Sequence, residues 1–179
     1  MMIKMLEDFN LLVSTSRRNE RNACSEIWYL IGEIGDRSSE AATTGIIGLT
    51  VAKTALNPKD VVRKLREILR QKPWEVKYIL KVVPIEHLTS ATIKDIAGVA
   101  AELAKNIGEG ETFRVTVEKR RSNLSSHEII DAVAKKVERK VNLDNPRKII
   151  LVEVVGEKAG ISLLEPDDVL SMEKERRTL

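Results

Sequence analysis

The sequence has few of the residues that build catalytic and metal centres. Its 179 residues include one cysteine and two histidines, and only 3% are aromatic. The single cysteine, Cys24, excludes an internal disulfide and a thiolate-rich metal site, and we interpret it as a small buried residue on a helix. His87 and His127 are 40 positions apart in the sequence and form no paired-histidine motif. We therefore expect no metal and no cofactor.

Motifs for nucleotide chemistry are also absent. The chain contains neither a GxGxxG turn after a strand nor a GxxxxGK[ST] phosphate loop. Its acidic residues are scattered over polar faces, where a solvated-surface role is the default. We expect that the protein is not an enzyme, and a small enzyme with an unrecognised site is the least favoured alternative.

Long apolar runs are missing as well. Residues 1–9 carry Lys4, Glu7 and Asp8 and lack the apolar core of a signal peptide. No later stretch approaches the ~18 uninterrupted apolar residues of a membrane span. Hydrophobic residues make up 42% of the chain and charged residues 32%, which is a globular balance. These features predict a soluble, cytoplasmic protein that has no membrane partner.

Charge is distributed unevenly although the net charge is only +3. Residues 112–148 contain ten Lys or Arg against five Asp or Glu, whereas residues 149–179 contain four against seven. A local excess of positive charge indicates an anionic partner better than the net charge does. The segment 112–148 is therefore the first place to look for a binding site.

The first half of the chain predicts a ferredoxin-like domain. Apolar and β-branched runs predict strands at residues 9–16 and 76–85 and a hairpin at 40–54, while helical spacing predicts helices at 19–34 and 57–72. The order β-α-β-β-α-β is typical of an antiparallel sheet with two helices on one face. We expect Trp28 and Trp74 to pack in the core or between the domains.

The second half predicts a further α/β domain. Helices are expected at residues 92–107 and 125–141, with strands at 112–120, 147–156 and 160–166. The strand-helix-strand unit implies a parallel pair with a right-handed crossover. The chain is thus predicted to be α/β (α+β), with an N-terminal ferredoxin-like domain at 1–86, an α-β-α-β-β domain at 87–166 and a tail at 167–179 that forms a surface helix or a frayed end.

The stretch "KRRSNLSSHEI", residues 119–129, is the main candidate for binding. Ser125 and Glu128 have the spacing of a capping box, so a helix is expected to begin there and to point its free N–H groups at the basic turn. Such a turn suits phosphate. The alternative is a solvated basic edge. The candidate residues are Lys119, Arg120, Arg121, Ser122, Asn123, Ser125 and His127.

Other cations supply weaker candidates. Arg17 and Arg18 follow the first predicted strand, and Lys53 ends the hairpin. Arg147 and Lys148 precede the strand at 147–156 and are expected to extend the basic face. Few aromatic residues are present, so a surface built on rows of stacking rings is not expected.

The segment from residue 112 to residue 164 resembles the THUMP domain. That family shows a strand running into "RR", a serine and "EI" opening a helix, then "V-x-L-x-x-P" and an "I-x-V-E-V" strand closing on "IS". The resemblance covers about residues 85–165, and the preceding unit is similar to the ferredoxin-like domain that accompanies THUMP. The matching positions are Arg120, Arg121, Ser126, Glu128, Ile129, Val141, Leu143, Pro146 and the run from Ile150 to Val154.

The resemblance implies a role on tRNA. THUMP proteins bind tRNA, and the paired module holds the 3′ acceptor end so that a catalytic domain reaches a distant nucleotide. Only fourteen residues follow Glu165, so the chain is similar to the stand-alone type that serves as an adapter for a separate tRNA cytidine acetyltransferase. DNA is not an expected partner. The alternative is a protein-protein interaction module whose ferredoxin-like sheets pair between chains without a direct RNA role.

Overall fold

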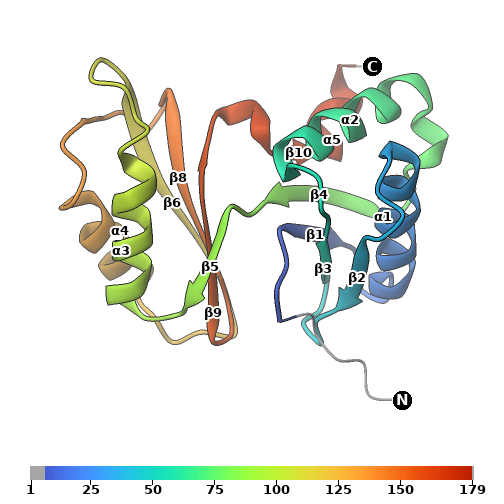
Figure 1. Ribbon diagram of the computed structural model, residues 1–179, viewed down its shortest axis with the longest axis horizontal. Helices are drawn as coiled ribbons and strands as arrows, with labels where there is room; N and C mark the ends of the chain where they lie inside the picture. Colours follow the sequence, from blue (N-terminus) through green and yellow to red (C-terminus); the bar gives the residue numbers. More distant parts are fainter. Residues whose placement is uncertain (1–6, 179) are drawn as a thin grey trace. The chain divides into compact units, whose positions relative to one another are not determined.

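The computed structural model describes residues 7–178 of the chain (Figure 1), so residues 1–6 of the predicted first domain and residue 179 of the predicted tail lie outside the described residues. The chain divides into two compact units. The first contains the described residues of Met1–Ile85 and Asp168–Leu179, and the second is Glu86–Asp167.

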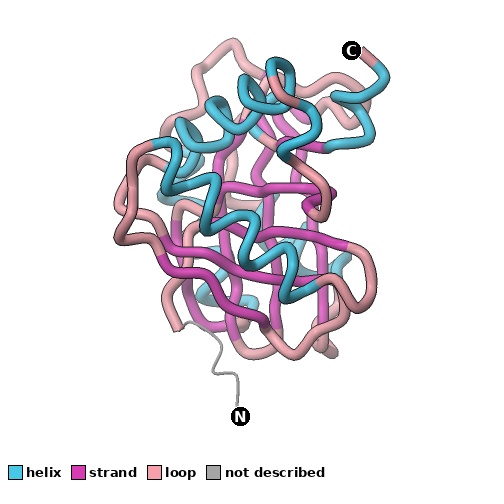
Figure 2. The backbone as a smooth tube through the Cα atoms, turned by 90° about the vertical axis from the view of Figure 1, so that its right-hand side faces the viewer, coloured by secondary structure: helices cyan, strands magenta, loops and turns pink. Residues whose placement is uncertain are grey.

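The first unit has the ferredoxin-like order that the sequence predicts. Its elements are β1 (Leu11–Thr15), α1 (Glu20–Ile34), β2 (Glu40–Thr43), β3 (Leu49–Lys53), α2 (Pro58–Gln71), the 3₁₀ turn η1 (Pro73–Glu75) and β4 (Ile79–Pro84), followed near the C-terminus by β10 (Leu170–Ser171) and α5 (Met172–Arg177). The strands pair in the order β10-β4-β1-β3-β2, all antiparallel. The helices of this unit lie in front of its strands in Figure 2 and cover one face of the sheet.

Local signals in the sequence explain where α2 begins and which face it buries. The Asn57 side chain accepts hydrogen bonds from the backbone N–H groups of Lys59 and Asp60, and Pro58 occupies the first turn, where its missing N–H is not needed. Val61, Val62, Leu65 and Leu69 are buried against the sheet. At about 1.5–3 kcal/mol for each large side chain, this burial is the main stabilisation of the helix.

The C-terminal segment differs from the predicted tail. β10 pairs with β4, and Leu170 and Met172 are buried in the core of the first unit. Arg66 Nε of α2 donates to Glu175 Oε1 of α5 over 2.8 Å. The predicted surface helix is thus confirmed as α5, and the alternative of a frayed end is wrong, because Leu170 and Met172 complete the core that residues 11–82 form.

The second unit contains the predicted parallel pair and two additional edge strands. Its elements are β5 (His87–Ser90), α3 (Ile93–Ala104), β6 (Thr112–Arg120), α4 (Ser126–Ala134), β7 (Lys140–Val141), β8 (Lys148–Val155), β9 (Lys158–Leu164) and η2 (Pro166–Asp168). The last residue of η2, Asp168, is the first residue of the C-terminal segment that belongs to the first unit. The strand order is β5-β9-β8-β6-β7, with β6 parallel to β8. The mixed α/β fold class predicted from the sequence is confirmed.

Two expectations about individual residues are wrong. The helix predicted at 125–141 ends at Ala134, and Val141 lies in the edge strand β7 with half of its surface exposed. Trp28 and Trp74 do not pack in the core: 53% and 66% of their surfaces are exposed. A sequence pattern assigns an apolar residue to the interior by default, but η1 carries no buried residue that would draw Trp74 inward.

Asp36 connects the end of α1 to the end of β3. Its carboxylate accepts hydrogen bonds from Ser38 Oγ, from Thr54 Oγ1 and from the backbone N–H of Ala55 at 2.7, 2.7 and 2.8 Å. These bonds favour the charged form and lower the pKa of Asp36 from 3.8 to about 2, with the bond from Ser38 as the largest cause. Asp36 is buried, so these donors replace the water that the carboxylate loses on folding.

We expect Asp36→Asn to destabilise the protein at neutral pH and to flatten its acid sensitivity. The pKa of Asp36 is lower in the folded than in the unfolded state, so its contribution is present above pH 3.8 and is lost as the pH falls toward 2. Urea unfolding at pH 7 and at intervals down to pH 2 measures both effects. Glu33→Gln, on an exposed position of α1, should leave stability at pH 7 near wild type. Equal acid sensitivity of wild type and Asp36→Asn would contradict the assignment.

Candidate nucleic-acid interface

Three loops of the second unit meet at one edge of its sheet. β5 and β8 both pair antiparallel with β9, and β6 pairs parallel with β8, so β5, β6 and β8 run in the same direction. The loops that follow these strands surround an open depression of about 480 Å³. The lining residues are Ser90, Ala91, Thr92, Arg121, Ser122, Asn123, Leu124, Gly156 and Glu157.

Backbone hydrogen bonds hold these loops together. The N–H of Gly156 donates to the carbonyl of Arg120 over 2.9 Å, and the N–H of Ala91 donates to the carbonyl of Glu157 over 2.9 Å. Gly156 has a φ of +61° at the first position of the two-residue turn between β8 and β9, a conformation that glycine adopts without strain. The β8–β9 turn thus joins the β5–α3 loop to the β6–α4 loop, and the depression has a fixed shape.

Two helices begin beside the depression. Thr92 caps α3 by accepting from the N–H of Asp95, and Ser125 caps α4 by accepting from the N–H of Glu128, both over 3.2 Å. The first N–H groups of each helix lack an intrahelical acceptor, and both helix dipoles present their positive ends at this edge. Both predicted capping residues are confirmed as caps. An anion placed here receives the field of both helices.

Lys119 and Arg120 of the basic triplet hold the site in place. Arg120 Nη1 donates to Glu153 Oε2 over 2.7 Å, and the Glu153 side chain is only 1% exposed. Lys119 Nζ donates to the carbonyl of Leu124 over 2.6 Å and spans the base of the loop. These contacts satisfy a buried carboxylate and fix the path of the β6–α4 loop. Both side chains therefore stabilise the fold of this loop, a role that the sequence does not reveal.

The remainder of the loop presents polar groups to the depression. Arg121 is exposed and has a φ of +52°, a left-handed conformation that turns the chain sharply after β6. Ser122 Oγ accepts from the N–H of Leu124 over 3.2 Å, and Asn123 is exposed. His127, in the first turn of α4, has Nε2 3.2 Å from Asp131 Oδ2. Arg121, Ser122 and Asn123 line the depression, whereas His127 does not.

Arg147 and Lys148 lie at the other end of the sheet. Lys148 is opposite Phe113 at the start of β6, while Arg120 is opposite Val155 at its end. Arg120 lies seven positions after Phe113, which corresponds to roughly 23 Å at about 3.3 Å per residue. These two cations therefore do not extend the basic turn, because parallel pairing places residues before β8 far from residues after β6.

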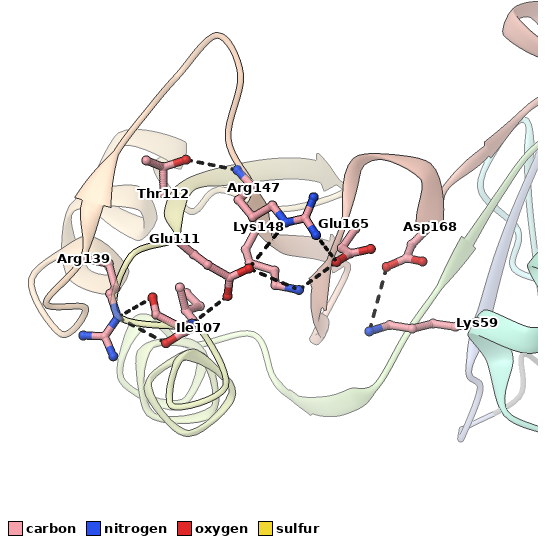
Figure 3. Close-up of polar contacts among 10 residues, drawn as sticks. Lys59, Ile107, Glu111, Thr112, Arg139, Arg147, Lys148, Glu165 and Asp168 are labelled. Atoms are coloured by element: carbon pink, nitrogen blue, oxygen red, sulfur yellow. Dashed lines mark hydrogen bonds and ion pairs between the residues drawn. The ribbon is translucent and has the colours of Figure 1, made fainter.

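The two cations are enclosed in a group of acids, drawn in Figure 3. Lys148 Nζ lies 3.0 Å from Glu165 Oε1 and 3.9 Å from Glu111 Oε2. Arg147 lies 3.5 Å from Glu111 and 3.7 Å from Glu165 through its Nε and Nη2 atoms. Two acids thus balance these two cations, which leaves Arg147 and Lys148 with little net charge to offer an anion.

The candidates in the first unit are also separated from each other. Arg17 and Arg18 follow the end of β1, and Arg18 has a φ of +74°. Lys53 ends β3, whose Ala52 is opposite Leu11 at the start of β1. Antiparallel pairing thus places Lys53 at the end of β1 opposite to the arginines, and its ammonium lies 3.1 Å from Asp8.

Sequence reasoning missed two of the three loops. The β5–α3 loop supplies Ser90, Ala91 and Thr92, and the β8–β9 turn supplies Gly156 and Glu157. The capping pair at Thr92 and Asp95 and the "VGEK" turn were visible in the sequence as local signals. Their proximity to residue 121 was not visible, because it depends on the strand order.

Among residues 7–178 no cluster of three or more His, Cys, Asp or Glu side chains is placed to hold a metal ion. Over the same part of the chain no helix is long and apolar enough to cross a membrane.

The chain thus combines a ferredoxin-like unit with an α/β unit in which polar loops and two helix N-termini meet at one edge of the sheet. Residues 90–164 match the THUMP domain, and the chain therefore contains a THUMP domain at these residues. THUMP is an RNA-binding domain. The resemblance inferred from the "RR", "EI" and "IS" motifs is confirmed. No curated protein sequence matches the chain.

Solved structures share this fold. PH1313 from Pyrococcus horikoshii Ot3 is 22% identical, with a TM-score of 0.59 over 88% of this chain and 55% of its own. TrmN from Thermus thermophilus is 18% identical, with a TM-score of 0.54 over 86% of this chain and 44% of its own. A 4-thiouridine synthetase, in a complex with RNA and bound ATP, is 14% identical, with a TM-score of 0.57 over 92% of this chain and 42% of its own. The chain thus spans about half the length of these proteins or less.

We expect Arg120→Ala to lower the free energy of unfolding by about 2–4 kcal/mol, because it leaves the buried Glu153 carboxylate without this partner. Urea denaturation measures the change. Replacing both partners by apolar residues, Arg120→Met with Glu153→Leu, should recover most of the loss, since no buried charge then remains. Arg121→Asn is the neighbouring control and should stay within about 0.5 kcal/mol of wild type. Equal effects of Arg120→Ala and Arg121→Asn would contradict the structural role of Arg120.

Proposed function

We propose that this protein binds tRNA, holds it through the 3′ acceptor end, and presents it to a separate modification enzyme, a tRNA cytidine N4-acetyltransferase. In this proposal the protein itself is not catalytic. The observation that carries it is the convergence of two helix N-termini and the Arg121 loop on one depression. RNA binding is supported by the THUMP domain and by the fold shared with a synthetase solved in complex with RNA.

The edge has the chemistry that a phosphodiester requires. A phosphate oxygen accepts hydrogen bonds, and this edge offers the first N–H groups of α3 and α4, the Arg121 guanidinium, the Ser122 hydroxyl and the Asn123 amide. Such contacts fix the position of the backbone without reading bases. A protein that holds many tRNAs alike needs this kind of recognition.

Glu157 limits the density of negative charge that the depression can bind. Its carboxylate is exposed at the rim, and Glu128 lies in the first turn of α4. Both acids repel phosphate, so the site favours one or two phosphates along a defined path over a dense anionic surface. A carboxylate beside a backbone-binding site also offers an acceptor for an exocyclic amino group of a base.

The presenting role rests on the resemblance to the adapter type. The chain covers 42% of the synthetase and 44% of TrmN, so the likeness concerns the part of each protein that has the paired-unit fold. We assign the chemical step to another protein because the adapter type implies one, and that resemblance names an acetyltransferase.

We expect tRNA binding to weaken steeply with salt and to depend on Arg121. Each phosphate contact contributes about 0.7–0.9 to the slope of log affinity against log salt. Arg121→Asn keeps a residue that tolerates the left-handed φ, removes the charge, and should reduce affinity for total tRNA roughly 3- to 10-fold while lowering that slope by about one contact. Filter binding across a salt series measures both quantities.

Arg147→Ala is the matched control for Arg121→Asn. It removes a cation from the same unit at the end of the sheet where Glu111 and Glu165 balance it, and should change affinity less than 2-fold by roughly the same electrostatic reasoning. Reversed effects would move the interface to the other end of the sheet. A wild-type protein that retains no tRNA at low salt would favour the alternative, a protein-interaction module that has no RNA role.

Reconstitution tests the presenting role. A tRNA cytidine acetyltransferase, an acetyl donor and tRNA are combined with and without this protein, and acetylated cytidine is quantified by mass spectrometry of nucleosides. We expect modification to require the wild-type protein, and Arg121→Asn to lower the rate at subsaturating protein and to recover at high concentration. Acetylation that is equally fast without the protein would contradict the adapter role and leave RNA binding intact.

A further inference from the structure

Trp74 is an exposed indole in a structured segment of the first unit. It lies in η1, directly after α2, and 66% of its surface is accessible. An exposed tryptophan loses the hydrophobic stabilisation that burial gives, which for a side chain of this size amounts to a few kcal/mol. The three loops that line the depression of the other unit do not include this residue, so the proposed phosphate site leaves it without a role.

Cations are frequent in the sequence around Trp74. Lys72 and Lys77 flank η1 and are exposed. Arg70 lies one helical turn before Trp74, and its side chain is 59% exposed although its Nη2 lies 3.4 Å from Glu175 Oε2. Arg176 of α5 reaches the same place, because its Nη2 donates to the carbonyl of Val76 over 3.1 Å. Residues 70–77 contain three cations and one acid, Glu75. The exposed indole therefore lies in a segment whose cations outnumber its acids.

The segment that carries Trp74 is held from two sides. The Glu26 carboxylate of α1 accepts from the backbone N–H groups of Lys77, Tyr78 and Ile79 at 3.0–3.2 Å. Arg176 holds the carbonyl of Val76 from the other side, and α5 is in turn tied to α2 through Arg66 and Glu175. Figure 1 shows α2 and α5 next to each other. The ring is presented on a fixed backbone, which lowers the entropy lost when a ligand stacks on it.

We propose that Trp74 with Arg70, Lys72, Lys77 and Arg176, named here the Trp74 surface, is a second RNA contact that binds unpaired nucleotides. The indole face stacks on a base, and the surrounding cations contact the phosphates on either side. An aromatic ring set among Lys and Arg side chains is the arrangement that single-stranded nucleic acid requires, since every base has a face to stack and every linkage a charge. This inference rests on the proposed function, because it adds a contact to the same RNA.

Trp28 provides an internal comparison. It lies on α1 of the same unit and is 53% exposed, yet no Lys or Arg occurs between Asn22 and Asp36. Exposure of an indole alone therefore does not distinguish the two tryptophans, whereas the charge around them does. Trp28 has no neighbouring cations on its own helix turn that could contact phosphates. We therefore expect RNA not to bind at Trp28 and not to quench its fluorescence.

Fluorescence separates the two tryptophans because the chain contains no others. Trp28→Phe leaves Trp74 as the reporter, and Trp74→Phe leaves Trp28. The probes are an oligouridylate of about 12 nucleotides, within the usual site size for single strands, a blunt RNA duplex of similar charge, and total tRNA. We expect the oligouridylate and tRNA to quench Trp74 saturably at low salt, the duplex to quench it little, and none to quench Trp28.

Affinity measurements on the full chain complete the test. Trp74→Ala should weaken oligouridylate binding roughly 5- to 150-fold, the range expected for loss of one stacked base. Trp74→Phe should stay within about 3-fold because the phenyl ring still stacks. Lys72→Gln with Lys77→Gln should lower the salt slope by about 1.4, at about 0.7 per contact on a single strand. The exposed positions allow these changes without unfolding, which thermal denaturation checks.

The possible results distinguish this inference from the function on which it rests. If wild type binds tRNA and oligouridylate while Trp74 emission and Trp74→Ala affinity do not change, the Trp74 surface is not an RNA contact and tRNA binding stands. If Trp74 responds to the acetyltransferase and not to RNA, the surface is a protein contact and the inference is overturned. If wild type binds no RNA at low salt, both proposals are overturned.

Discussion

The parallel pairing of β6 with β8 is the constraint on which the binding edge depends. Because β5 also runs in this direction, the chain leaves the sheet three times at the same edge. Two of the three strands, β5 and β6, are followed directly by helices, α3 and α4. The topology alone therefore brings the positive ends of both helix dipoles to the same side of the sheet. A reversed β6 would place the α4 terminus at the opposite edge and divide the site.

The basic triplet at the end of β6 combines a structural role with a binding role. Arg120 compensates the buried Glu153, and Lys119 closes the loop through the Leu124 carbonyl. Arg121, one residue later, turns left-handed and lines the depression. Structural anchoring by the first two cations positions the third, since an arginine on a loose loop would lose side-chain and backbone entropy on binding phosphate. Stability and binding are therefore separable within three consecutive residues.

Local signals in the sequence predicted most of the elements, and long-range pairing explains what they missed. Asn57 with Pro58, Thr92 with Asp95 and Ser125 with Glu128 each act within four residues, so the starts of α2, α3 and α4 could be predicted.

The sequence did not predict β5 and β7. Their segments, "HLTS" and "KV", are short edge strands with no buried face, so they lack the alternation of apolar and polar residues that indicates a strand. β10 escaped because its partner, β4, lies far earlier in the chain.

The same reasoning applies to the site. The β6–α4 loop could be found from its cations and its cap, but its partner loops could not, because only the strand order brings Thr92 and Gly156 to Arg121. The role of Arg120 required the register that brings β8 beside β6. Apolar character predicts that Trp74 packs in the core or between the domains, whereas the approach of Arg176 to this segment becomes visible only when α5 is docked beside η1.

The distribution of charge within the THUMP unit determines which end of its sheet attracts an anion. The Lys148 end carries two cations and two acids within ion-pair distance, so their fields largely cancel beyond about one Debye length. The Arg121 end adds the positive ends of two helix dipoles to the charge of Arg121. Its acids are Glu157, Glu128 and Asp95, and the hydrogen bond from Ser90 lowers the pKa of Asp95 and keeps that carboxylate charged at the α3 cap, where it offsets part of one dipole. An approaching polyanion is therefore attracted to one end of the sheet even though the net charge of the whole chain is only +3.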